Sequence, residues 1–330
     1  MPLDARFRAG LKLPAICAPM FLVSGPDLVR EACLAGVVGA LPRPNARTVE
    51  EFGSWLASIR VSLDDAVETG RTVAPLAVNF PAKFDRHELD ESLRLCEKYG
   101  VDTVISVNGN PAEITKRVHD WGGRIFHDVT SLRFAEKAIS GGVDGLVCIG
   151  SGGGGHSGTV SHLALIPAVR AIFDGVIVAA GAITTGAAIR AAEILGADLT
   201  YLGTRFIATQ ESMAHAEHKQ MILDAGTASL RYMAARGGVP ANWLESSLAR
   251  AGVDLAAIDE ARRNSQEVLL PTELKYWKDV WSAGQGVDLI HDIPTVSELV
   301  TRLRCEYVAA CEKPDMSGAA RLVDQALDAG

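Results

Sequence analysis

The chain has 330 residues, of which 48% are hydrophobic and 22% charged, and its 40 acidic residues outnumber 32 basic ones to give a net charge of −8. This length supports one large domain or two modest ones, and the acidic balance without a basic cluster argues against nucleic-acid or membrane-surface binding. No apolar run approaches the roughly 18 residues of a transmembrane helix, and residues 1–12 lack the apolar core of a signal peptide. We therefore expect a cytoplasmic protein whose six scattered cysteines remain thiols.

Short apolar runs alternate with amphipathic segments over the first two-thirds of the chain. The predicted strands are residues 13–20, 37–41, 75–80, 103–107, 124–129, 145–150, 176–180 and 199–203. The predicted helices are residues 26–35, 48–61, 87–99, 111–120, 131–141, 161–173 and 185–196. Several strands are continuously apolar, as in VIVAA, which is typical of parallel strands covered on both faces. Eight such strands with crossover helices predict an α/β fold, a (β/α)8 TIM barrel, with a doubly wound open sheet as the alternative.

The pattern changes after Phe206. Residues 208–286 read as mostly helical, with breaks at residues 236–240 and near Pro271, and they predict a helical subdomain over the barrel mouth. A final amphipathic segment, 295–312, is predicted to close the ring of helices. The expected domains are a barrel formed by residues 1–208 and 287–330 and a mostly helical subdomain formed by residues 209–286.

Glycine and threonine follow the last two predicted strands. Gly181 ends the seventh strand and Gly203-Thr204 ends the eighth. The phosphate site of a TIM barrel commonly lies after these two strands, where glycine lets backbone N–H groups approach phosphate oxygens. The paired turns therefore predict a phosphate site, although each glycine alone is also typical of a tight turn.

A run of glycines follows the sixth predicted strand, in the sequence SGGGGHSG from Ser151 to Gly158. Such a run costs too much conformational entropy to form a helix or strand, so its backbone can lie flat against a planar ligand. His156 is its one side chain that exchanges protons near neutral pH. Its place after a barrel strand favours a catalytic or substrate-contacting role over that of an ordinary loop histidine.

Four further polar residues have two interpretations each. His127 ends the fifth strand, where it either faces the barrel mouth or caps the strand, and Asn79 either binds the edge of a heterocycle or forms a turn. His215 and His218 have helical spacing but no third ligand, which favours a solvated or packing role over a metal site.

These motifs together resemble the nitronate monooxygenase family, formerly called 2-nitropropane dioxygenases. The resemblance covers roughly residues 13–308 and rests on APM, PLAVNF, GGHSG, AAGAI followed by LGTRFIATQES, and WSAGQG. It implies an FMN-dependent oxidoreductase built on a (β/α)8 barrel, with His156 as the active-site histidine and no metal.

The resemblance also implies which residues bind FMN. Gly181, Ala182, Gly203 and Thr204 match the phosphate cradle, and Ala18, Pro19, Met20 and Asn79 match contacts along the ring. Further cofactor or cleft contacts are expected from His127, Ser151, Gly152, Gly153, Gly154, Gly155, Trp281, Ser282, Ala283, Gly284 and Gln285. The chain departs from relatives at Cys17, at Ala182 in place of glycine, and at Asp128 in place of lysine, so that a cation beside the flavin must come from elsewhere or be replaced by neutral donors.

Two activities fit this resemblance. The first is oxidation of small alkyl nitronates with O2 and without a nicotinamide. The alternative is an NAD(P)H-dependent FMN reductase of enoyl thioesters or quinones, since flavin barrels can stack nicotinamide without a Rossmann fingerprint. A third hypothesis is a binding barrel without catalysis. The substrate and the oligomeric state, a homodimer included, stay open.

Overall fold

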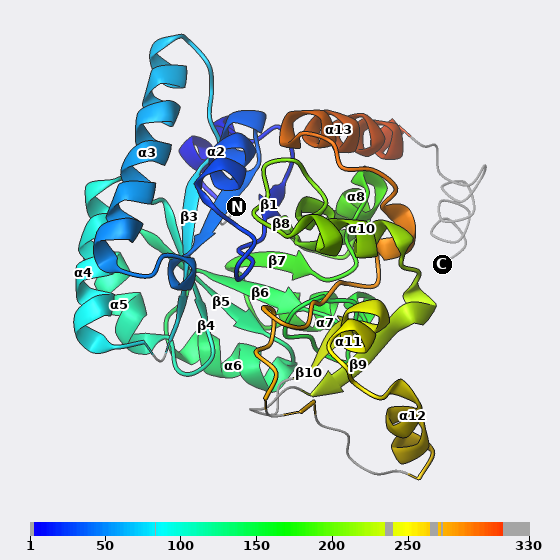
Figure 1. Ribbon diagram of the computed structural model, residues 1–330. Coiled ribbons are helices and arrows are strands. Elements are labelled where there is room, and N and C mark those ends of the chain that lie inside the picture. The colour runs from blue at the N-terminus through cyan, green and yellow to red at the C-terminus, as the bar shows by residue number, and fades with distance from the viewer. Residues whose placement is uncertain (1–2, 83, 235–239, 265–269, 272, 313–330) are drawn as a thin grey trace, which may run out of the picture.

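The computed structural model describes residues 3–82, 84–234, 240–264, 270–271 and 273–312 (Figure 1). Eight parallel strands form a closed barrel in which each pairs with the next and β8 pairs with β1. The strands are β1 (Ala15–Cys17), β2 (Val38–Pro42), β3 (Leu76–Pro81), β4 (Thr103–Val107), β5 (Arg124–Val129), β6 (Gly145–Ile149), β7 (Val176–Ala180) and β8 (Leu199–Leu202). The predicted TIM barrel is confirmed, and the open sheet is excluded.

Helices surround the barrel. They are α2 (Pro26–Ala35), α3 (Val49–Glu68), α4 (Arg86–Lys98), α5 (Ala112–Asp120), α6 (Leu132–Ser140), α7 (His162–Arg170) and α8 (Gly186–Ile194). Side chains such as Thr48, Asp85 and Thr185 accept backbone hydrogen bonds at the helix starts, which fixes where each helix begins. Helix α13 (Val296–Glu312) packs against α8 and α2, burying Leu299 and Leu303. It closes the ring as predicted.

The barrel interior is sealed at the amino ends of the strands. Alternate strand residues such as Ile105 and Phe126 point inward and form an apolar core. A short helix that the sequence pattern did not reveal, α1 (Ala5–Ala9), adds Phe7 to this core, and the Arg124 guanidinium at the start of β5 lies over the Phe7 ring. With this end filled, a site is open only at the carboxyl ends of the strands.

The segment after β8 is less helical than predicted. It holds α9 (Thr204–Ile207), α10 (Ala216–Asp224), α11 (Glu245–Arg250) and α12 (Leu255–Arg263), but also an antiparallel pair, β9 (Leu230–Ala234) and β10 (Pro240–Leu244). In the part of the chain that the structure describes, the 3-10 turns are η1 (Arg43–Asn45), η2 (Thr227–Ser229) and η3 (Val287–Leu289).

Tertiary burial explains why the sequence pattern did not predict β9 and β10. Trp243 of β10 is fully buried in a cluster with Met233 of β9, so packing overrides local propensity. The predicted break at 236–240 lies outside the described residues except for Pro240, which opens β10, and Pro271 lies between regular elements. The domain boundaries stay a prediction. Within the described ranges, no helix is both long and apolar enough to cross a membrane.

Candidate active site

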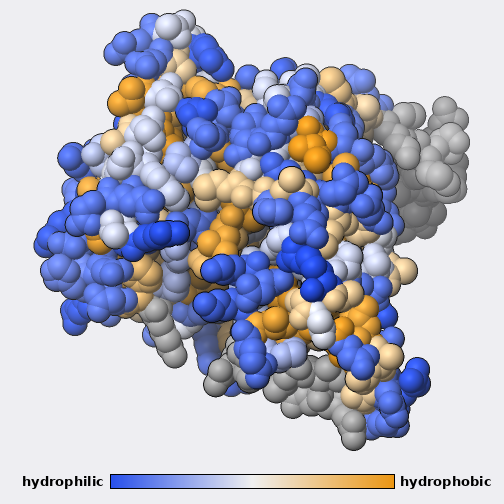
Figure 2. All heavy atoms as spheres, viewed as in Figure 1, coloured by the Kyte–Doolittle hydropathy of each residue, from blue (hydrophilic) through white to orange (hydrophobic). Residues whose placement is uncertain are grey.

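A cavity of about 400 Å³ opens at the carboxyl ends of the barrel strands. Figure 2 shows hydrophobic side chains gathered at the centre of this face, bordered by hydrophilic ones. The inward-facing residues at the strand ends line the cavity floor, namely Asn79, Val107, Asp128, Ile149, Ala180 and Tyr201. This volume and mostly apolar lining are typical of a small-molecule site.

Three segments that are distant in sequence interlock along one wall of the cavity. They are the glycine loop (residues 151–155), the β7 turn (residues 181–184) and the return segment (residues 281–286). The Gly152 carbonyl accepts hydrogen bonds from Ala182 N–H at 3.2 Å and from Gln285 N–H at 3.0 Å. A Cβ added to Gly154 would lie 2.7 Å from the Gly284 nitrogen. Only glycine permits this backbone approach, which explains the glycine at position 154.

The phosphate turns predicted from the sequence meet at this wall. Gly181 has a φ of +118° and lines the cavity with Ala182, Gly203 and Thr204. Thr204 Oγ1 accepts a hydrogen bond from Gly284 N–H at 2.8 Å, so its own hydroxyl hydrogen remains available to a ligand.

Unusual backbone conformations concentrate around the cavity. Among the described residues, four non-glycine residues have positive φ, and Asn108, Ala182 and Trp277 of these line the cavity. Ala182 holds a φ of 54°, in the left-handed region that favours glycine. Such conformations cost energy and cluster at functional sites, which supports this cavity as the active site.

His156 lies at the cavity, as its place in the sequence predicted. Its backbone bridges to Ala241 of β10, and its ring meets the Trp277 ring edge-on with 5.2 Å between centroids. Burial lowers the pKa of His156, so its imidazole is neutral near pH 7. A neutral imidazole both donates and accepts a hydrogen bond and can act as a base.

His127 does not reach the cavity, which corrects its expected cofactor contact. Side chains alternate along β5, so His127 points to the outer face and Asp128 to the barrel interior. The Nδ1 atom of His127 lies 2.7 Å from Ser106 Oγ, and burial lowers the pKa of His127 to about 4. His127 is a structural residue of the layer between strands and helices.

Most other predicted residues border the cavity. Those that line it are Ala18, Pro19, Met20, Asn79, Gly153, Gly154, Gly155, Trp281, Ser282 and Gly284. Asn79 Nδ2 donates to the Ile105 carbonyl at 3.1 Å, which fixes the orientation of its amide. Ser151, Gly152, Ala283 and Gln285 lie behind the lining and brace it instead.

Several residues that line the cavity were not among the predicted site residues. Asp128 and Tyr201 are on the floor, and the period-2 alternation of their strands carries the signal that places them there. Trp277 and His218 belong to the segment whose structure the pattern misread. His218 packs as predicted, since its ring stacks on Trp281 at 4.9 Å. Asn242, in the missed strand β10, donates to the Gly153 carbonyl at 2.6 Å and fixes the glycine loop.

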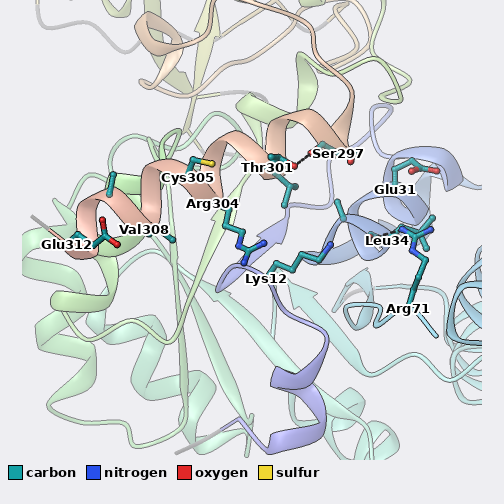
Figure 3. Close-up of a pocket in the computed structure, with 13 residues that line it drawn as sticks. Lys12, Glu31, Leu34, Arg71, Ser297, Thr301, Arg304, Cys305, Val308 and Glu312 are labelled. Carbon is teal, nitrogen blue, oxygen red and sulfur yellow. Dashed lines mark hydrogen bonds between the residues drawn. The ribbon is translucent and has the colours of Figure 1, made fainter. Parts of the chain in front are cut away.

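A second hollow of about 540 Å³ lies on the outer wall between α2 and α13. Figure 3 shows the long side chains of Lys12 and Arg304 in this gap, with Arg71 nearby. Its lining comes from helices and loops, with no residue of a barrel strand. Because the catalytic groups of TIM barrels gather at the carboxyl ends of the strands, the cavity at the mouth is the candidate active site.

The closed parallel barrel, its cavity and the neutral histidine beside it define a TIM-barrel enzyme. A sequence model of one family, described as nitronate monooxygenase, matches residues 57–306. The chain belongs to the nitronate monooxygenase family and is an oxidoreductase of that type.

Relatives and a solved structure extend over nearly the whole chain. A nitronate monooxygenase of Paraburkholderia phytofirmans is 26% identical over 92% of this chain and 94% of its own. A (3aS,4S,5R,7aS)-5-hydroxy-7a-methyl-1-oxo-octahydro-1H-indene-4-carboxyl-CoA dehydrogenase of Rhodococcus jostii is 24% identical over 94% of this chain and 96% of its own. The structure of a nitroalkane oxidase from Streptomyces ansochromogenes, 24% identical, superposes with a TM-score of 0.70 over 93% of this chain and 99% of its own.

Replacing His127 with Gln is expected to change stability and leave ligand binding intact. The folded-state pKa of His127 is about 4, below its ordinary value of 6.5, so the unfolded chain binds the extra proton between these values. The stabilisation is therefore fully present above pH 6.5 and is lost as the pH falls towards 4, by at most about 3 kcal/mol at 1.36 kcal/mol per pH unit. Urea unfolding at pH 7.5 and 4.5 should show the wild-type advantage shrinking. An advantage independent of pH would contradict the buried, neutral His127.

Proposed function

We propose that this enzyme binds FMN in the cavity and oxidises small alkyl nitronates with O2. The observation that carries the proposal is the convergence of the two glycine turns and His156 on one cavity in a member of this family. The apolar lining suits a small alkyl substrate and limits access of water.

The residues at the cavity fit FMN. A Cβ added to Gly203 would lie 3.6 Å from the Met20 sulfur and 3.8 Å from the Ala18 Cβ, so the backbone of this turn approaches the residues assigned to the ring at ordinary contact distance. Ala18, Pro19, Met20 and Asn79 border the same cavity with apolar surface and one amide. We therefore assign the phosphate to Gly181, Ala182, Gly203 and Thr204, and the ring to the four residues of the first and third strand ends.

The chain's own residues bind and orient the substrate. FMN, when bound, would supply the redox chemistry between the anionic nitronate and O2. His156 is neutral, so its N–H donates a hydrogen bond to the nitro oxygens of a nitronate. Toward a neutral nitroalkane, the unprotonated nitrogen of the same ring accepts the α-proton. Trp277 holds the ring edge-on and restricts its orientation.

Oxygen consumption tests the proposed reaction. The purified protein, supplied with FMN, is expected to consume O2 on addition of propyl-2-nitronate, without a nicotinamide. Oxygen uptake that starts only after NADH or NADPH is added would contradict the proposal.

The alternative function is an NAD(P)H-dependent FMN reductase of enoyl thioesters or quinones. One observation favours it, namely the Rhodococcus jostii relative whose name gives a carboxyl-CoA substrate and which matches almost the full chain. An enoyl thioester oxidises the reduced flavin, so thioester-dependent consumption of NADPH would support this alternative.

A further inference from the structure

The cavity floor carries an acidic side chain without a cationic partner. Asp128 lies on the inward face of β5 and lines the cavity, and its Oδ1 is buried with no hydrogen-bond partner among the described residues. Among the described residues that line the cavity, the titratable ones are Asp128, His156, Tyr201 and His218, and none is lysine or arginine. An ionised carboxylate in this position would be partly desolvated and would lack an opposite charge, which disfavours the ionised form.

The surroundings of Asp128 favour its protonated form. Burial raises its pKa to about 7, from an ordinary value of 3.8. Tyr201 reaches the floor from β8 with an unpartnered hydroxyl, and both burial and Asp128 raise the pKa of Tyr201, so it stays neutral as well. The Cys148 thiol on β6 also has its pKa raised, chiefly by burial, and His156 above the floor is neutral. None of these groups offers a positive charge.

The two oxygens of Asp128 differ in access. Oδ1 is sealed from the cavity and has no partner, whereas Oδ2 is not sealed, and the half-buried side chain borders the cavity. A donor without an acceptor is rarer in proteins than an under-satisfied carbonyl oxygen. The proton is therefore better placed on Oδ2, where a molecule in the cavity can accept it.

We propose that Asp128 is a neutral carboxylic acid that donates a hydrogen bond from the cavity floor to an acceptor atom of the flavin ring, an inference that rests on the proposed FMN site. The ring system offers carbonyl oxygens and unprotonated nitrogens, which are acceptors of the required kind. Below pH 7 the acid is mostly protonated, so a cationic group would find little carboxylate on this floor. Asp128 thus favours a ligand whose acceptor atoms are uncharged or anionic.

This hydrogen bond couples FMN binding to a proton. Because the bound acceptor favours the protonated acid, FMN raises the pKa of Asp128, and binding above pH 7 takes up a proton. The affinity of the wild-type protein for FMN should therefore fall with rising pH, by up to tenfold per pH unit above the pKa of the empty site. Asp128→Asn keeps a hydrogen-bond donor of similar shape but cannot titrate.

The experiment measures the dissociation constant of FMN by quenching of its fluorescence, from pH 6 to pH 9. The variants are wild type, Asp128→Asn and the control Asp120→Asn, an exposed position at the end of α5. The FMN phosphate titrates near pH 6 in every sample and cancels in the comparison. We expect wild type and Asp120→Asn to lose affinity at least tenfold between pH 7 and pH 9, and Asp128→Asn to change less than threefold.

Failure of the Asp128 role can be distinguished from failure of the FMN site. Equal pH dependence in wild type and Asp128→Asn would overturn the role of Asp128 while leaving the FMN site intact. Absence of FMN binding by the wild-type protein at every pH would overturn the FMN site and this inference with it. If Asp128→Asn does not unfold cooperatively, calorimetry of wild type in two buffers of different ionisation enthalpy decides the matter. Uptake approaching one proton at pH 8 supports the proposal, and no uptake overturns it.

Discussion

Replacing His156 with Asn is expected to lower the turnover of neutral nitroalkanes by about 100-fold or more, while the FMN content stays close to that of wild type. The expected loss follows the usual contribution of a general base. Asn keeps a hydrogen-bond donor but cannot accept the α-proton. FMN is expected to be retained because the phosphate is assigned to Gly181, Ala182, Gly203 and Thr204 and not to His156.

The substrate's ionisation state and the pH profile separate the two roles of His156. A preformed nitronate needs no base, so its turnover should fall far less in His156→Asn than that of the parent nitroalkane. The wild-type rate on the nitroalkane should also decline as the pH falls through the lowered pKa of His156, below its ordinary 6.5, and the variant should lack this limb. His127→Gln is the matched control. Unchanged nitroalkane turnover in His156→Asn would remove the histidine from the mechanism.

Replacing Gly154 with Ala is expected to weaken FMN binding by about 10- to 100-fold, the equivalent of an overpacking cost of roughly 1–3 kcal/mol. The added Cβ would lie 2.7 Å from the Gly284 nitrogen and 2.9 Å from the Ala283 carbonyl carbon. Both are backbone atoms, so no side-chain rotation relieves the contact. The glycine loop and the return segment must then move apart at the cavity wall.

The adjacent residue supplies the control. A Cβ on Gly155 meets nothing within 4 Å, so Gly155→Ala adds the same methyl group without displacing protein. Titration of FMN and thermal unfolding of both variants would check the prediction. Equal FMN affinity and equal stability in the two variants would show that the close packing at Gly154 does not hold the site together.

The barrel was predictable from the sequence because its strands are short, apolar and covered on both faces. Strands β4, β5 and β7 begin and end where the pattern placed them. The hairpin β9–β10 was not predictable, because Trp243 is fixed by tertiary packing and its local sequence carries no alternation. Helix α1 has only five residues, too few for an amphipathic pattern to appear.

Site residues were predictable where a residue type suited to binding or catalysis directly follows a predicted strand. Glycines after the sixth to eighth strands converge because strand carboxyl ends share one face of a barrel, and His156 lies among them. His127 had two interpretations because the sequence alone does not show on which side of the strand its ring lies. Whether His127 or Asp128 faces the barrel interior depends on which of the alternating β5 residues point inward. The pairing of β5 with its neighbours in the closed barrel fixes this. Asn242 could not be linked to the glycine loop, since their contact spans 89 residues.

The visible absorbance of the bound flavin under anaerobic conditions tests the central claim most directly. The protein is mixed in turn with propyl-2-nitronate and with NADH or NADPH, and the oxidised flavin band is followed with time. Nitronate oxidation predicts a spectral change with the nitronate and an unchanged spectrum with either nicotinamide. Rapid bleaching by NADH or NADPH, with no response to the nitronate, would contradict the account and identify a nicotinamide-dependent reductase.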